Sequence, residues 1–236
     1  MKVVILAGGL GTRLVELTEA IPKPMVEVGG KPILWHIMKI YAKFGFKDFY
    51  VALGHKGEII KKYFSQNSSG WNINLIETGE ATMTGGRIKR LQDIVGNETF
   101  MLTYGDGLSD VNITKLLEFH KKHKKFVTMT AVRPPARFGV IKLENDRVSY
   151  FKEKSKLDEG WVNGGFFVMQ PELFKYIKND ETYLEREPLE TLCKEKQLFA
   201  FKHSGFWQCV DNKRDLDRLQ LSYSKDAPWL RRIDKV

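Results

Sequence analysis

Cysteine is scarce in this sequence, and long apolar segments are absent. Only Cys193 and Cys209 occur among the 236 residues, which is too few for a disulfide framework or for a zinc site with four cysteine ligands. No apolar run approaches the roughly 20 residues that a membrane-spanning helix needs, and the first residues lack a signal-peptide pattern. We therefore expect a cytoplasmic protein that does not contact a membrane.

Internal repeats, low-complexity tracts and linkers are absent as well, so we expect a single domain over residues 1–236. Hydrophobic residues make up 42% of the chain and charged residues 28%, a balance that allows a buried core. The net charge of +9 is compatible with nucleic-acid binding. However, the densest basic run, residues 120–125, lies at the end of an expected helix, where cations complement the helix dipole. We expect small anionic substrates and no nucleic acid.

Short apolar runs alternate with segments of helical periodicity in the first half of the chain. The runs at residues 3–6, 49–53, 73–76, 100–104 and 127–132 are typical of buried strands. Helical spacing covers residues 31–44, 58–64, 87–95 and 112–123. This alternation predicts a three-layer α/β core around a parallel sheet.

The pattern changes after residue 132. Residues 140–143 and 148–151 flank Asn145-Asp146, which predicts a β-hairpin. Residues 164–169 form a further expected strand. We expect additional helices from Pro171, where proline suits the first helical position, and over residues 187–196 and 212–224.

A glycine-rich turn directly follows the first expected strand. Gly8, Gly9 and Gly11 allow the backbone to turn and to approach a ligand, and exposed amides in such turns bind anions. Arg13 adds a forked cation, and Lys23 follows between two prolines that stiffen the chain. Many such turns bind nothing, but these groups together could hold a polyphosphate.

Two familiar nucleotide motifs do not fit this turn. A P-loop requires a Lys-Ser or Lys-Thr pair, which is missing here. The dinucleotide fingerprint is met at Gly9 and Gly11 but fails at Leu14. The turn therefore belongs to neither class.

Two aspartates each admit a functional and a structural interpretation. Asp106 follows an apolar strand, where ligands of open α/β sheets bind, although a plain Asp-Gly turn would also explain it. Asp211 precedes an expected helix, and from the residues alone an N-cap is the favoured interpretation.

The segment LAGGLGTRL followed by PKPMVEVGGKP resembles the signature of the sugar-1-phosphate nucleotidyltransferases. The later segments TGEATMTGGRIKR, YGDG, FGV, NGGFFV and FWQ most resemble those members of the family that use CTP and glucose 1-phosphate. The resemblance spans nearly the whole chain. It implies a three-layer Rossmann-like fold with a mostly parallel central sheet and a small β-hairpin subregion on the sugar side. It also implies Mg²⁺ as cofactor and a homo-oligomer.

The resemblance further implies roles for individual residues. Catalytic roles fall to Arg13, Lys23 and Asp106, and metal binding to Asp106 and Asp211. The implied nucleotide-binding residues are Leu6, Ala7, Gly8, Gly9, Gly11, Thr12, Arg13, Lys23, Thr78, Gly79, Thr84, Arg87 and Asp106. The implied sugar-binding residues are Tyr104, Gly139, Glu153, Lys154, Asn163, Gly164 and Trp207.

The implied reaction needs no general base, because a sugar phosphate is mostly dianionic at neutral pH. The chain departs from the family pattern at Ser155, which replaces a proline, and in a shorter segment over residues 65–72. Another nucleotide or phosphorylated acceptor therefore stays open. A nucleotide-sugar-dependent glycosyltransferase would carry a D-x-D motif, which Asp106-Gly107-Leu108 does not provide. A regulatory relative would be expected to lack Arg13, Lys23 or Asp106.

Overall fold

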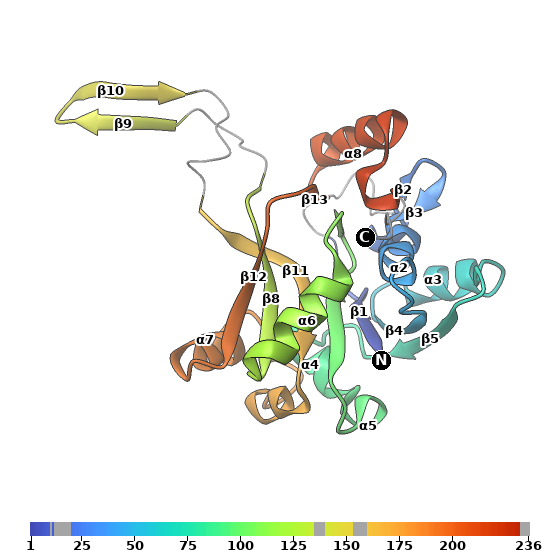
Figure 1. Cartoon of the computed structure of the whole chain (residues 1–236). Coiled ribbons are helices and arrows are strands. Elements are labelled where there is room, and N and C mark those ends of the chain that lie inside the picture. The colour runs from blue at the N-terminus through green and yellow to red at the C-terminus, as the bar shows by residue number, and fades with distance from the viewer. Residues whose placement is uncertain (10, 12–19, 135–139, 153–159, 232–236) are drawn as a thin grey trace.

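The computed structural model describes all residues except 10, 12–19, 135–139, 153–159 and 232–236 (Figure 1). Its centre is a seven-stranded sheet with one antiparallel member, β11. The strands follow in space as β12 (Leu198–His203), β8 (Val127–Val132), β11 (Val162–Met169), β6 (Phe100–Tyr104), β1 (Val3–Leu6), β4 (Asp48–Leu53) and β5 (Asn72–Glu77). All other neighbouring pairs are parallel. The expectation of a mostly parallel α/β sheet is confirmed.

β1 is a central strand that is buried on both faces. Val3 and Ile5 belong to one apolar cluster, whereas Val4 and Leu6 belong to the other. Alternate residues of a strand point to opposite faces of the sheet, so the unbroken apolar run of β1 supplies both cores. This local pattern is why the strand could be recognised in the sequence.

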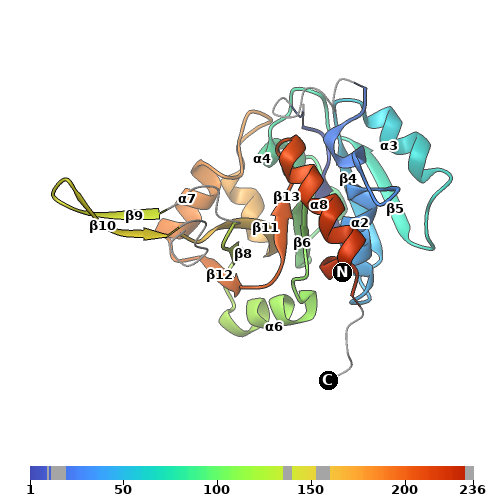
Figure 2. The same ribbon diagram turned by 90° about the horizontal axis from the view of Figure 1, so that it is seen from above.

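Helices cover both faces of the sheet (Figures 1 and 2). The first cluster packs under α2 (Ile33–Ala42), α3 (Gly57–Phe64), α6 (Ile113–His123) and α8 (Lys213–Lys225). The second packs under α4 (Thr84–Lys89), α5 (Gln92–Val95), α7 (Glu187–Lys194) and the 3-10 helix Pro171–Tyr176. These two clusters and the sheet between them make the three expected layers. Within the described ranges, no helix is long and apolar enough to cross a membrane.

Several element assignments from the sequence need correction. The helix expected over residues 31–44 begins only at Ile33, because Lys31–Pro32 forms the short strand β3 with β2 (Glu27–Val28). The helix expected over 87–95 is divided into α4 and α5. The helix at Pro171 is a 3-10 helix. The sequence did not predict the strands β7 (Gly107–Ser109), β12 and β13 (Trp207–Cys209). These strands are short or contain polar residues, and the strands with which they pair lie far away in the sequence.

The expected hairpin is formed by β9 (Val140–Glu144) and β10 (Arg147–Lys152), with Asn145 in the left-handed region at φ 56°. It projects away from the helices and the large sheet in both views (Figures 1 and 2). Ile141, Leu143, Val148 and Phe151 are each at least half exposed. The strand register brings Val148 opposite Leu143 and Phe151 opposite Ile141, so these side chains form one apolar face.

Candidate active site

A cavity of about 700 Å³ opens at the carboxyl ends of β1 and β6, the edge where ligands of open α/β sheets bind. Its wall combines the glycine turn, the proline-flanked lysine and both candidate metal ligands. Sequence-predicted residues in the wall are Leu6, Ala7, Gly8, Gly9, Gly11, Lys23, Thr84, Arg87, Tyr104, Asp106, Asn163, Trp207 and Asp211. Residues distant in sequence are thus brought together at one site.

Glycine is required near the wall by close approach of neighbouring groups. A Cβ atom on Gly8 would lie 2.3 Å from a guanidinium nitrogen of Arg87. A Cβ on Gly105, just before Asp106, would lie 2.7 Å from the carbonyl oxygen of Leu6. Neither position can hold a side chain without moving the strand ends that shape the cavity.

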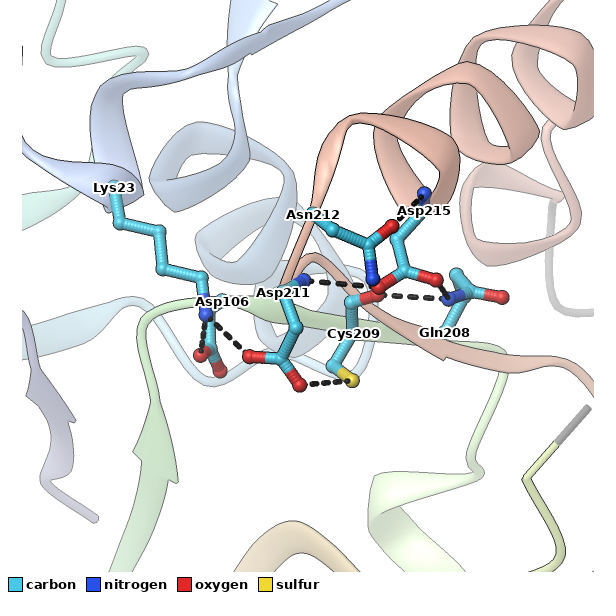
Figure 3. Close-up of polar contacts among 7 residues, drawn as sticks. All are labelled: Lys23, Asp106, Gln208, Cys209, Asp211, Asn212 and Asp215. Atoms are coloured by element: carbon cyan, nitrogen blue, oxygen red, sulfur yellow. Dashed lines mark hydrogen bonds and ion pairs between the residues drawn. The ribbon is translucent and has the colours of Figure 1, made fainter. Parts of the chain in front are cut away.

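Lys23 joins the two candidate metal ligands. Its Nζ donates to Asp106 Oδ2 at 2.7 Å and to Asp211 Oδ1 at 2.9 Å (Figure 3). Burial alone would lower the pKa of Lys23, but the charges and hydrogen bonds of Asp106 and Asp211 outweigh it and raise the pKa. Lys23 therefore carries its proton at neutral pH, and one cation satisfies both carboxylates.

A short antiparallel ribbon sets the distance between the two aspartates. β7 and β13 pair directly after Asp106 and directly before Val210, with Gly107 opposite Cys209. The Val210 N–H also donates to the Asp106 carbonyl oxygen at 3.0 Å. This register brings Asp211 beside Asp106. The N-cap interpretation of Asp211 is wrong, because the Asn212 side chain caps α8 by accepting the Asp215 N–H at 3.0 Å.

Cys209 and Asp215 flank Asp211 on its other sides (Figure 3). The Cys209 thiol lies 3.6 Å from Asp211 Oδ2. Burial, followed by the charges of Asp211, Asp106 and Asp215, raises the pKa of Cys209 to about 12, so the neutral thiol donates to the carboxylate. Asp215 Oδ2 accepts the Asp211 backbone N–H at 3.1 Å. The sequence did not mark either residue as functional.

The carboxylate pair fits a divalent ion that takes only some of its ligands from the protein. Asp106 and Asp211 direct one oxygen each at a common cation, the Lys23 ammonium. In the part of the chain that the structure describes, no three His, Cys, Asp or Glu side chains converge as a metal site. A site with two carboxylates suits Mg²⁺, which usually keeps water and phosphate oxygens as the remaining ligands.

Arg87 connects the glycine turn to two neighbouring segments through hydrogen bonds. Its two terminal nitrogens donate at 2.7–3.1 Å to oxygens in three segments: the loop after β1, the end of β4 and the loop after β5. The five acceptor residues are Gly8, Leu53, Thr78, Gly79 and Glu80. Burial, and then the charge of Arg90, lower the pKa of Arg87. Thr78 and Gly79 thus contact Arg87 and do not themselves line the cavity.

A second polar cluster lines the opposite wall. Glu185 accepts hydrogen bonds from the hydroxyls of Tyr104 and Thr84, both at 2.6 Å. Asn163 Nδ2 donates to the Tyr104 oxygen at 3.2 Å. Burial, and then the charge of Glu185, raise the pKa of Tyr104, so its hydroxyl stays protonated. Glu185 was missed because nothing in its local sequence marks a carboxylate that meets the first half of the chain.

Trp207 lies in the cavity wall and also packs against the larger apolar cluster. Its indole N–H donates to the Gly164 carbonyl oxygen at 2.8 Å, which links β13 to β11. Gly164 is thereby placed beside the wall. Further wall residues that the sequence did not indicate are Pro24, Thr82, Met83, Gly105, Tyr183, Glu185 and Cys209.

Five sequence-predicted site residues lie outside the described residues. They are Thr12, Arg13, Gly139, Glu153 and Lys154. Their roles remain predictions from the sequence.

Comparisons with known proteins agree on one family. The model of the nucleotidyl transferase family matches residues 2–225. A glucose-1-phosphate cytidylyltransferase from Salmonella typhi is 47% identical over 97% of this chain and 98% of that protein. A mannose-1-phosphate guanyltransferase from Saccharomyces cerevisiae is 33% identical over 91% of this chain and 62% of that protein. Among solved structures, HddC from Yersinia pseudotuberculosis superposes with a TM-score of 0.75 at 25% identity, over 94% of this chain and 99% of that one.

Proposed function

Because this chain belongs to the nucleotidyl transferase family, we propose that it transfers the cytidylyl group of CTP to glucose 1-phosphate. The products are CDP-glucose and pyrophosphate. The high identity to the Salmonella typhi cytidylyltransferase over nearly all of both chains supports this choice of substrates. Members of this family generally use a divalent metal ion; for this chain we propose Mg²⁺.

One observation carries the proposal: Lys23, Asp106 and Asp211 meet at the wall of a cavity that the glycine turn also lines. The arrangement places a protonated lysine and a cation-binding carboxylate pair beside backbone amides. Polyphosphate binding needs these groups, because several negative charges must be neutralised in a confined space.

The reaction is an in-line displacement at the α-phosphorus of CTP. An oxygen of the glucose 1-phosphate dianion forms the new P–O bond, and the bond to the leaving pyrophosphate breaks. The attacking oxygen carries no proton, so the protein needs no general base. A divalent ion held by Asp106 and Asp211 would supply positive charge to the phosphate oxygens.

The remaining work is done by this chain through positioning and charge. Lys23 would transfer its contacts from the aspartates to the α-phosphate, where negative charge develops. We assign Arg13 to the triphosphate on the sequence resemblance alone. We assign Tyr104, Asn163 and Trp207 to the wall that holds the sugar.

The second candidate within the family uses a different nucleotide. The Saccharomyces cerevisiae relative is a guanyltransferase of mannose 1-phosphate, and its lower identity makes this assignment the weaker one. The family match also favours nucleotidyl transfer over the glycosyltransferase alternative.

Pyrophosphate release distinguishes these candidates. The purified protein is assayed with Mg²⁺ and each of glucose 1-phosphate and mannose 1-phosphate against CTP, UTP, dTTP, GTP and ATP in turn. We expect release with CTP, and a loss of at least about 100-fold in kcat for Asp106→Ala, the scale seen when one transition-state contact is removed. Asp217→Asn, on the exposed side of α8, is the control and should retain wild-type rates. Preference for GTP with mannose 1-phosphate would contradict the assignment.

We further propose that the protein acts as one nucleotidyltransferase domain in a reducing cytoplasm and forms homo-oligomers. The exposed apolar face of the β9–β10 hairpin supports self-association. An isolated two-stranded hairpin is marginally stable in water, and a second copy of the chain would bury this face. The proposal of a reducing compartment is supported by Cys193 and Cys209, which are both free thiols.

A further inference from the structure

Asp215 lies behind the two cation-binding carboxylates and does not line the cavity. It belongs to the first turn of α8 and is only 3% exposed. Its Oδ2 accepts the Asp211 N–H, and its Oδ1 lies 3.3 Å from Gln208 Nε2 (Figure 3). The partial positive charge at a helix N-terminus stabilises a buried carboxylate at this position.

The two contacts connect Asp215 to the segment that carries Asp211, at Gln208 and at Asp211 itself. The bond to the Asp211 N–H restrains the backbone from which the Asp211 side chain extends. The Gln208 amide also donates to the Cys209 carbonyl oxygen at 2.8 Å, within the strand that pairs beside Asp106. One buried side chain therefore restrains the segment that carries Asp211, and the β7–β13 pairing holds that segment beside Asp106.

We propose that Asp215 is a positioning residue for the divalent ion, and this inference rests on the proposed function. Asp215 holds Asp211 in the orientation that directs a carboxylate oxygen at the shared cation. It also adds a third carboxylate, behind those of Asp106 and Asp211, which favours a divalent ion over the lysine alone. Groups that orient metal ligands in this way typically change metal affinity 10–100-fold.

Asp215→Asn is the sharpest variant because it preserves size. An asparagine oxygen can still accept the Asp211 N–H, but its amide nitrogen would then face the Gln208 amide nitrogen, donor against donor. Asp217→Asn is the matched control: it removes the same charge from the same helix, where Asp217 is 60% exposed and pairs only with Lys213 among the described ion pairs. Asp215→Glu retains the charge but displaces the carboxylate by one methylene group, so it tests positioning separately from charge.

The readout is Mn²⁺ affinity, measured with Mn²⁺ alone by the loss of its free electron-spin-resonance signal. We expect the Kd of Asp215→Asn to rise about 10–100-fold, that of Asp217→Asn to stay at the wild-type value, and that of Asp215→Glu to fall between them. Urea unfolding of each variant shows whether the protein is folded at the assay temperature. In turnover assays, Asp215→Asn should require more Mg²⁺ but approach wild-type kcat when Mg²⁺ is saturating.

An unchanged Mn²⁺ affinity in Asp215→Asn would overturn the proposal, even if that variant were less stable. If Asp215→Asn did not fold, equal affinities of Asp215→Glu and wild type would overturn it, and a weaker Asp215→Glu would support it. Wild-type protein that binds no Mn²⁺ would overturn both the ion site and the role of Asp215. Protein that binds Mn²⁺ through Asp215 but releases no pyrophosphate would overturn only the proposed reaction.

Discussion

Replacing Arg87 with methionine tests whether one buried guanidinium holds the nucleotide end of the cavity together. Arg87 is 4% exposed and donates to oxygens in three segments: the loop after β1, the end of β4 and the loop after β5. Methionine fills similar space but donates nothing. The substitution therefore removes the hydrogen bonds by which Arg87 joins the three segments, while leaving much of the packing intact.

The expected loss of stability can be worked out from the contacts. Three of the five bonds, those to Leu53, Thr78 and Gly8, lie in buried surroundings. Each lost hydrogen bond to a charged donor costs about 1.5–3 kcal/mol. The carbonyl oxygens of Leu53 and Gly8 keep other donors, the Thr78 N–H and hydroxyl and the His55 N–H respectively, so neither is left unsatisfied. Part of this loss is offset, because methionine avoids the burial of a cation, whose cost is evident in the lowered pKa of Arg87. We expect a net decrease of about 3–5 kcal/mol in the free energy of unfolding.

Calorimetry and urea unfolding measure this decrease directly. For a chain of this size, about 3–5 kcal/mol corresponds to a Tm lower by roughly 10 °C. We also expect the KM for CTP to rise about tenfold, equivalent to a loss of about 1.4 kcal/mol in binding, because the Arg87 hydrogen bond no longer restrains Gly8. Arg90→Met is the control: it removes an ion pair with Asp180 at an exposed position three residues away, where such pairs contribute little.

A Tm for Arg87→Met close to that of Arg90→Met would refute this reasoning. It would mean that packing holds the three segments together and that the guanidinium contributes little to the free energy of unfolding. A lower Tm with an unchanged KM for CTP would confine the role of Arg87 to stability.

Two further predictions concern the rest of the molecule. Burial, and then the charge of His123, lower the pKa of His120 to about 4. Neutral His120 is therefore compatible with the fold above pH 6.5, and its protonation costs about 3 kcal/mol of folding stability as the pH falls to about 4. Urea unfolding across this range should show a shallower pH dependence of stability for His120→Gln than for wild type, and equal slopes would contradict the assignment. Replacing Ile141 and Phe151 with serine should convert the oligomer to monomers in light scattering, because it removes apolar surface from the β9–β10 face. Lys142→Ser, on the opposite face, should leave the assembly intact, and a monomeric wild-type protein would contradict the proposed self-association.

The core of the fold was readable because its signals are local. The apolar run of β1, the periodicity of α2 and α6 and the N-cap of α6 at Asn112 each depend on residues within one element. The strands β7 and β13 were missed because they are short, and their stability comes from pairing with each other across about half of the chain.

The candidate site was predictable in part for the same reason. The glycine turn and Asp106 follow directly on buried strands, so their position at the sheet edge could be inferred. By contrast, Glu185 meets Tyr104 and Thr84 from 81 and 101 residues away. No local pattern could reveal this contact, because it arises from the docking of the loop before α7 on the start of α4.

The sequence by itself determined the alternation of strands and helices, the glycine turn and the chemical groups available for phosphate and metal binding. These features follow from side-chain periodicity and from the conformational freedom of glycine, which act within a few residues. The tertiary structure alone decided that Lys23 meets Asp106 and Asp211 across separations of 83 and 188 residues. Such a meeting depends on how the sheet, the β7–β13 ribbon and α8 pack together, because only long-range packing can offset the entropy of bringing distant segments to one point.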